Sequence, residues 1–421
     1  MLKKHTLGSD LDLRLEQEND HTSCPYRLTT FFFIFLLVLT GIRSAKAEYY
    51  EIIPSANLTQ EYNDNIFVSE TAVNDFITSV ASDLAVLGMD ERLDWNLSGG
   101  VRFREYAENK LQNQQDWHAK IGLNYRHTER SSIYTDVSFI TDTRPDTIEN
   151  GFVTRSADRE RYMFNIGGRH AASETSSPFF TYSYVQEDFK FFPERNQRTN
   201  ILAIGVSHRL DRILPMTTGQ MFVNYSHSDY ATSDDDTVRF LLGVEKTWSE
   251  RWRFNANAGI RYTKSTFVTL TPNATPPPTA FTGEGVSDDW GPATDIALSY
   301  DGEYTRIALT AGRDVVPGSG QGRSLEQVRW TGNVNHRFSD NLRGNLNASI
   351  QSQQSFRDIN PALRVDRWSF LFSPSISHDF TRHWSIECVY RFFFLDDRRG
   401  NQEAIQNIFA VTLSFRYPFI K

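Results

Sequence analysis

The sequence predicts an all-β fold: a transmembrane, antiparallel, up-and-down β-barrel. Three observations favour it. Apolar and polar residues alternate in short segments along most of the chain, short and long connections alternate between these segments, and an export signal precedes them. A single strand of a soluble β-sandwich shows the same alternation, so the recurrence and the signal decide in favour of the barrel. Closure is expected because lipid does not tolerate unpaired strand edges.

The last expected strand, Ile408–Phe419, shows the alternation most clearly. Successive side chains of a strand point to opposite faces. One face carries Phe409, Val411, Leu413, Phe415, Tyr417 and Phe419. The other face carries Ala410, Thr412, Ser414, Arg416 and Pro418. The apolar face ends in aromatic residues, as a strand does where it reaches the interface of a bilayer.

The composition agrees with strands that are apolar on one face only. The chain has 421 residues, 39% of them hydrophobic, with 31 Phe, 17 Tyr and 8 Trp, yet its mean hydropathy is −0.47. After Ala47 no apolar run approaches the roughly 20 residues of a membrane helix. This length would ordinarily indicate two or three domains, but large barrels are an exception.

Residues 1–47 are predicted to be an N-terminal extension and a secretory signal peptide, and residues 48–421 the barrel domain. The apolar core Leu28–Ile42 follows Arg27, and Ala45-Lys46-Ala47 places small residues where signal peptidase recognises them. The alternative is an N-terminal membrane anchor, but the core is short for one. Because Met1–Tyr26 is long for the segment before such a core, we hypothesise that translation starts downstream.

Cysteines and charge narrow the functional classes. Cys24 precedes the apolar core and would leave with the signal, so Cys388 would stand alone without an intramolecular disulfide. Cleavage removes six Lys or Arg and five Asp or Glu, which changes the formal net charge from −8 to −9. An acidic chain without a basic patch is unsuited to general nucleic-acid binding.

About eighteen strands are expected, and sixteen is the alternative count; both lie in the even-numbered range of outer-membrane barrels. The expected segments are Tyr49–Tyr62, Phe76–Leu87, Leu93–Arg104, Trp117–Arg126, Ile133–Ile140, Tyr162–His170, Phe179–Gln186, Asn200–Leu210, Gly219–Ser226, Val238–Trp248, Trp252–Thr263, Thr294–Tyr300, Tyr304–Val315, Val328–Phe338, Leu342–Gln353, Trp368–Phe380, Trp384–Leu395 and Ile408–Phe419.

The connections between these segments fall into two classes. The tight ones are Thr128–Ser131, Ser249–Arg251, Asp301–Glu303, Ser339–Asn341 and Thr381–His383. The long ones are Thr141–Arg159, Phe189–Arg198, Val268–Gly291, Pro317–Gln327, Arg357–Val365 and Asp396–Ile405. Short periplasmic turns and long outer loops are typical of outer-membrane barrels. Prolines at 272 and 276–278 favour an outer loop for Val268–Gly291.

Three of the tight turns resemble one another. Each has an aromatic residue, a hydroxyl residue, polar turn residues and then a large apolar residue, in Lys246–Arg253, His336–Arg343 and His378–Ser385. The pattern predicts an aromatic girdle at the inner interface, and ordinary hairpin chemistry explains it equally well.

If the apolar face meets lipid, the opposite face lines the lumen, and that face is rich in cations. The candidate lining residues are Arg102, Arg104, Lys120, Arg126, Arg169, Arg239, Arg253, Arg261, Arg329, Arg337, Arg343, Arg367, Arg391 and Arg416. The same face carries the carboxylates and amides Asp94, Glu245, Asp379, Glu387, Asn255, Asn257, Asn333, Asn335, Asn345, Asn347 and Gln351. One interpretation is a lumen for an anionic or hydroxyl-rich solute. The other is a wall stabilised by cross-strand ion pairs, and the two are compatible.

No enzyme, metal site or cofactor is expected. The histidines are scattered, without metal-ligand spacing. His227-Ser228-Asp229 has the residue types of a catalytic triad, but neighbours in a strand point to opposite faces and cannot form one site. Asp234-Asp235-Asp236 is expected at an outer loop, where such a run is usually solvated. A barrel enzyme at the outer rim would need a catalytic cluster that the sequence does not contain.

The opening of the expected barrel resembles a known family. Ile53–Phe67 reads Ile-Pro-Ser-Ala-Asn-Leu-Thr-Gln-Glu-Tyr-Asn-Asp-Asn-Ile-Phe, and Asp75-Phe76-Ile77-Thr78 follows. These motifs are similar to those of outer-membrane β-barrel porins often encoded with exopolysaccharide export systems. The resemblance implies a channel or accessory for polysaccharide export in the cell outer membrane, with polysaccharide and its export proteins as partners. It carries over no catalytic residues.

Two other functions remain open: a general diffusion porin, and a structural or adhesive barrel plugged by its loops. In each case the partners would include outer-membrane lipid, lipopolysaccharide and the barrel-assembly machinery, and no nucleic acid. The terminal aromatic that this machinery recognises would be Phe419, although Ile420 and Lys421 follow it.

Overall fold

The structure is a computed structural model that describes residues 49–142, 158–190, 192–231, 233–270, 281–318, 323–355 and 365–420. For residues 268–270, 281–284 and 420 only the main chain is described. The expected signal segment, its cleavage site and the downstream start lie outside these residues and stay predictions.

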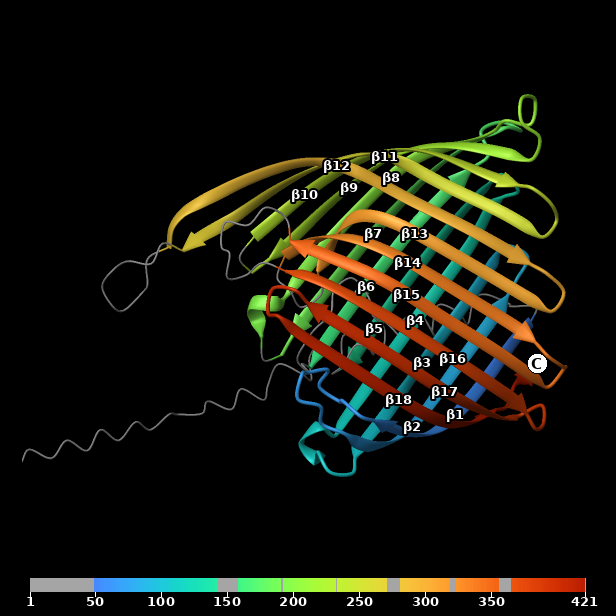
Figure 1. Ribbon diagram of the computed structural model, residues 1–421. Coiled ribbons are helices and arrows are strands. Elements are labelled where there is room, and N and C mark those ends of the chain that lie inside the picture. Colours follow the sequence, from blue (N-terminus) through green and yellow to red (C-terminus); the bar gives the residue numbers. More distant parts are fainter. Residues whose placement is uncertain are drawn as a thin grey trace, which may run out of the picture. The chain divides into compact units, whose positions relative to one another are not determined.

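The barrel wall consists of eighteen antiparallel strands, which confirms the preferred count (Figure 1). Each strand pairs with the next in the chain, and β1 closes the barrel by pairing with β18 from Ser55↔Arg416 to Asn63↔Ile408. The strands are β1 Tyr49–Asn63, β2 Asp75–Met89, β3 Leu93–Tyr106, β4 Gln114–Thr128, β5 Ser131–Asp142, β6 Arg159–His170, β7 Ser176–Phe189, β8 Gln197–Arg209, β9 Thr217–Tyr230, β10 Ser233–Thr247, β11 Trp252–Leu270, β12 Phe281–Asp301, β13 Thr305–Gly318, β14 Arg323–Arg337, β15 Leu342–Ser355, β16 Asp366–Asp379, β17 Trp384–Asp397 and β18 Gln402–Arg416.

The expected final strand is interrupted before Phe419. β18 ends at Arg416, and a two-residue strand, β19 (Phe419–Ile420), resumes pairing with β1 at Ile52↔Phe419. Between them Tyr417 still donates its N–H to the Pro54 carbonyl at 3.1 Å. Pro418 has no N–H to donate, which explains a break in the ladder at this point.

Among the residues that the structure describes, helices occur only in the connections. η1 (Lys110–Gln112) and η2 (Pro193–Arg195) are single turns. In the part of the chain that the structure describes, no helix is both long and apolar enough to span a bilayer.

The two faces of the wall differ as the alternation predicts. Leu58, Val80 and Phe103 lie opposite one another on β1, β2 and β3, and each is about half exposed. The other face is the inner one, because only there can residues of non-adjacent strands meet. Arg239 of β10, for example, bonds Asp314 of β13. The apolar face is therefore the exterior of the barrel.

Three similar turns share one hydrogen-bond pattern at the rim where the chain ends. The N–H of Trp248 donates to the Trp252 carbonyl at 3.0 Å, and that of Phe380 donates to the Trp384 carbonyl at 3.0 Å. Phe338 donates to Leu342 at 2.9 Å in the same way. All three aromatic side chains are exposed at this turn rim, as a girdle requires. Their position at a bilayer interface stays a prediction.

At the opposite, loop rim several expected long loops are shorter. Val268–Gly291 is wrong as a loop: β11 and β12 pair from Thr269↔Gly283 downward, and the ring centroids of Tyr262 and Trp290 lie 4.9 Å apart across them. The prolines at 272 and 276–278 lie outside the described residues. Pro317–Gln327 is mostly strand. Residues 398–401 form a four-residue turn where Asp396–Ile405 was expected to be a loop.

Two expected long connections are only partly described. Of Thr141–Arg159 and Arg357–Val365, residues 143–157 and 357–364 lie outside the described ranges. Phe189–Arg198 is confirmed as a connection of seven residues, 190–196, that contains η2.

Candidate functional site

The strand register places all fourteen predicted lining cations on the inner face of the wall. Arg102 and Arg104 alternate with the exterior Phe103 on β3, for example, and Arg391 shares its face with Phe393 and Leu395, which pack inward on β17. Contact of these residues with a solute stays a prediction.

At least eight of these cations lie within ion-pair distance of a carboxylate. Most pairs join neighbouring strands, which favours the wall-stabilising interpretation for these residues. The pairs are Arg104–Asp116 at 3.8 Å, Lys120–Asp136 at 3.8 Å, Arg126–Asp94 at 3.7 Å, Arg253–Glu245 at 3.8 Å, Arg343–Asp379 at 2.5 Å, Arg367–Asp397 at 2.8 Å, Arg261–Asp289 at 3.7 Å and Arg239–Asp314.

The other six differ in position. Arg102 lies toward the loop rim of β3, and Arg329 of β14 donates to Thr331 at 3.2 Å. Arg337, at the turn rim, lies over the Tyr304 ring at 5.3 Å. Arg169, Arg391 and Arg416 form no ion pair with any residue that the structure describes, so their charge faces the lumen uncompensated by a near carboxylate.

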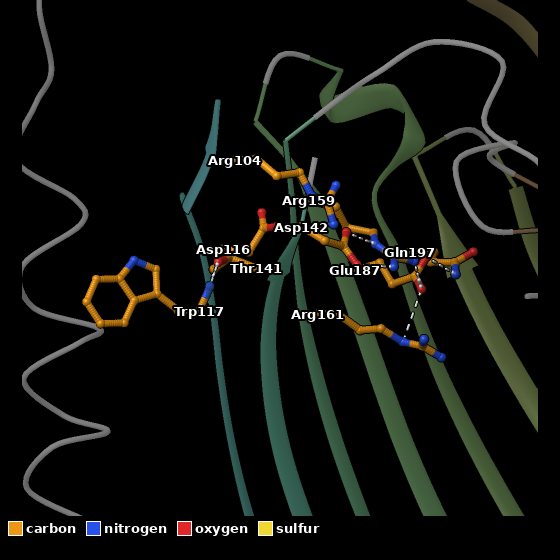
Figure 2. Close-up of polar contacts among 9 residues, drawn as sticks. All are labelled: Arg104, Asp116, Trp117, Thr141, Asp142, Arg159, Arg161, Glu187 and Gln197. Atoms are coloured by element: carbon orange, nitrogen blue, oxygen red, sulfur yellow. Dashed lines mark hydrogen bonds and ion pairs between the residues drawn. The ribbon is translucent and has the colours of Figure 1, made fainter. Parts of the chain in front are cut away.

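A buried ionic cluster that the sequence did not predict lies near the loop rim of β5–β8 (Figure 2). Two guanidinium nitrogens of Arg159 donate to Asp142 at 2.6 and 2.8 Å, and a third lies 3.0 Å from Glu187. Arg161 also reaches Glu187 at 3.2 Å, and Gln197 donates to it at 2.7 Å. Glu187 is only 2% exposed. Several charge-assisted bonds offset the desolvation of this carboxylate.

The signal for this cluster was present in the sequence. The expected strand begins at Tyr162, whereas β6 begins at Arg159. Arg159 therefore ends an expected loop, and Arg161 lies between that loop and the expected strand. Both continue the inward positions of that strand, two and four residues before Met163. Figure 2 shows the same alternation on β4, where Asp116 points toward the cluster and Trp117 points away from it.

A second cluster joins β9–β11 to the β13–β14 hairpin. Arg261, only 1% exposed, reaches Glu326 at 3.3 Å, and Arg313 reaches the same carboxylate at 2.7 Å. Ser324 donates its N–H to Asp235 at 3.1 Å and its hydroxyl lies 3.1 Å from the Tyr230 hydroxyl. These contacts hold the loop-rim end of the hairpin against strands that it does not pair with.

The β1–β2 connection also packs inward. Ile66 packs with Ile77 of β2 and Tyr106 of β3 on the inner face, and Val68 packs on Phe393 and Leu395 of β17. The β1–β2 connection and the β13–β14 hairpin therefore both reduce the cross-section of the lumen at the loop rim.

The motif behind the family resemblance positions this connection. The Asn63 side chain accepts the N–H of Asn65 at 3.0 Å, and the Asn65 amide donates to the carbonyls of Ser69 and Ile405 at 2.8 and 2.9 Å. Asp64 accepts from the Asn407 main chain at 2.6 Å. The Asn-Asp-Asn sequence thus fastens the connection to β18.

The residues considered as a catalytic triad or as an acidic outer loop do not form a single site. His227 faces outward and lies 3.0 Å from Asp236, whereas Ser228 faces inward and lies 3.2 Å from Thr199. Asp234–Asp236 was wrong as an outer loop, because these residues belong to β10 and alternate between its faces. Within the described ranges, no three His, Cys, Asp or Glu side chains group as a metal site would require.

Part of the chain matches one family model, and its fold resembles several solved β-barrel structures. Residues 46–182 match the family described as "Putative beta-barrel porin 2", a segment that contains the motif at 53–78. No curated protein sequence matches the chain.

The solved structures that resemble this one are distant. OccAB4 of Acinetobacter baumannii has 9% identity and a TM-score of 0.45, covering 89% of this chain and 99% of its own. OpdO of Pseudomonas aeruginosa has 8% identity and a TM-score of 0.44, covering 89% and 98%. The copper transporter OprC has 10% identity and a TM-score of 0.44; it covers 82% of this chain, which spans only 64% of OprC.

The localisation follows from the wall and the family match together. A closed eighteen-stranded barrel with an apolar exterior and a girdle of exposed aromatics is built to span a bilayer. Its first third matches a porin family. The chain is a porin-like β-barrel protein of the outer membrane.

Proposed function

We propose that this protein is a weakly ion-selective channel for small hydrophilic solutes. The observation that carries the proposal is a neutral polar panel on the inner face of β14–β16. Asn333 lies opposite Asn347, Asn335 opposite Asn345, and Asn345 in turn opposite Ser375. Amides and hydroxyls exchange hydrogen bonds with water and sugars at little cost, so the panel offers a polar path along the wall.

The charges on the wall support weak selectivity. At least eight of the fourteen predicted cations have a carboxylate partner, so most of the positive charge is compensated locally. The reduced loop rim further favours small solutes over a polymer.

The first prediction is that the refolded protein conducts ions in planar bilayers with a reversal potential close to zero in a salt gradient. Liposomes that contain it should swell at similar rates in neutral and in acidic sugars of equal size. Absence of conductance would contradict the proposal and favour a plugged structural barrel.

Passage of an anionic exopolysaccharide is the second candidate. Three cations that form no ion pair with a described residue, Arg169, Arg391 and Arg416, favour it, since a guanidinium binds carboxylate well. Block of the current by short acidic oligosaccharides, but not by neutral ones, would support this candidate over the general channel.

A further inference from the structure

The β12–β13 ladder stops well before either strand ends. Its last pair toward the loop rim is Thr294↔Arg313. β12 nevertheless stays paired with β11 up to Phe281, and β13 stays paired with β14 up to Gly318↔Arg323. The two hairpins separate at this seam, and Figure 1 shows the β11–β12 hairpin running on beyond the point where β13 turns away.

The end of the β13–β14 hairpin lies inside the barrel. We call residues 313–318 and 323–327 the hairpin tip. By the alternation of β14, Ser324 and Glu326 occupy exterior positions, on the same side as the exposed Trp330. Yet Ser324 bonds Tyr230 and Asp235, and Glu326 reaches Arg261, all on the inner face. The exterior positions of the tip therefore pack against the inner face of β9–β11.

The tip is buried on both of its own faces. Val315 is 5% exposed, Leu325 is fully buried, and Gln327 is 6% exposed. Such burial is expected for a segment enclosed by the wall and not for an edge exposed to water.

Two ion pairs hold the tip to strands across the barrel. Glu326 pairs with Arg261 of β11, and Asp314 pairs with Arg239 of β10. When such an ion pair separates, its charged groups can instead contact water or salt ions. Apolar side chains that bury the same area have no such replacement when they separate.

The register also defines a second arrangement of the tip. If the ladder continued past Thr294↔Arg313, Ala293 would lie opposite Asp314, and Gly291 opposite Val316. The main chain of Gly291 and Ala293 has no partner on β13 in the present arrangement, since no pair extends beyond Thr294. Pro292 and Pro317 have no N–H, so the extended ladder would lack some bonds and would not dominate outright.

From these observations we propose that the hairpin tip is a gate. In the state described it is latched inside the lumen by Glu326 and Asp314. In the second state it swings into the wall, extends the β12–β13 ladder and widens the loop rim. Two discrete packings of one element are the usual basis of such a switch. The inference rests on the proposed channel function for its conductance, but not for the movement itself.

The latch is tested with Glu326→Gln, and Asp379→Asn is the matched control. Both variants remove one carboxylate that pairs with arginine inside the barrel, but Asp379 lies at the turn rim with Arg343. Glu326→Gln should raise single-channel conductance about twofold by widening the narrow end of the pore. The control should leave the conductance close to that of the wild type. Equal conductance in wild type and Glu326→Gln would overturn the gate.

Two cysteine pairs, made in a Cys388→Ser background, test the movement directly. Oxidation of Asp235→Cys with Ser324→Cys should lock the tip inside and keep conductance low until reductant is added. Oxidation of Gly291→Cys with Val316→Cys should trap the second state and raise conductance. If the second pair never forms a disulfide in the folded protein, the tip does not move and the proposal is wrong. If it forms but no variant conducts, the gate moves and it is the channel function that fails.

Discussion

At the scale of single residues, the structure shows a buried carboxylate, Glu187, that the sequence did not single out. Glu187 is almost fully buried and accepts from Arg159, Arg161 and Gln197. Removing one partner of a buried ionic group leaves the others desolvated without compensation.

Glu187→Gln should therefore lower the free energy of unfolding by about 3–5 kcal/mol. The control is Asp301→Asn, because the Arg306–Asp301 pair at 2.8 Å is exposed on both sides and should contribute at most about 1 kcal/mol. Urea unfolding in lipid vesicles, followed by tryptophan fluorescence, measures both variants. Equal losses would show that burial does not govern these pairs.

The sequence predicts which face of the wall a side chain occupies better than it predicts which residue that side chain contacts. Alternation alone places Arg104, Arg239 and Arg261 on the inner face, because a strand has a strict period of two. It does not show that Arg261 reaches Glu326, since that contact requires β14 to pack against β11 across the barrel. Long-range contacts of this kind depend on how the hairpins bend.

At the scale of elements, connections were the hardest part to predict. The prolines at 272 and 276–278 favoured a loop from Val268, yet the strands on either side of 271–280 pair far beyond the expected ends. Alternating residues such as Val286 and Trp290 carried the true signal. The turn-rim hairpins were predicted well because their chemistry is local.

The β1–β2 connection gives a test at this scale. Asn65→Ala removes two side-chain donors to the carbonyls of Ser69 and Ile405 within a buried site, which should cost about 1–3 kcal/mol. The connection should then leave the inner wall more often, so that cleavage by an added protease at residues 66–73 becomes faster. Thr71→Ala, in the exposed part of the same connection, is the control. Unchanged cleavage in Asn65→Ala would show that the apolar contacts of Ile66 hold the connection without the amide.

At the scale of the whole molecule, the assignment of the two faces is what the other conclusions depend on. The apolar exterior and the polar inner face come from the same strands, as in β13 and β14, because successive side chains alternate between them. A barrel is the one arrangement in which eighteen strands can do this without leaving an edge in lipid. The alternation predicted this closure from the sequence, whereas the inward packing of two loop-rim elements needed the structure.

Two neighbouring residues of β13 test the assignment. Leu309 is about half exposed on the exterior, and Thr310 lies on the inner face between Ala297 and Thr331. An arginine in place of Leu309 would face hydrocarbon, which costs about 2–4 kcal/mol near the bilayer midplane. Thr310→Arg would place the same charge in the water of the lumen. It should leave folding nearly unchanged and shift the reversal potential toward anion preference. Vesicle refolding yields and bilayer recordings measure the two effects, and the opposite result, with Thr310→Arg misfolding and Leu309→Arg altering selectivity, would reverse the inside and outside of the wall.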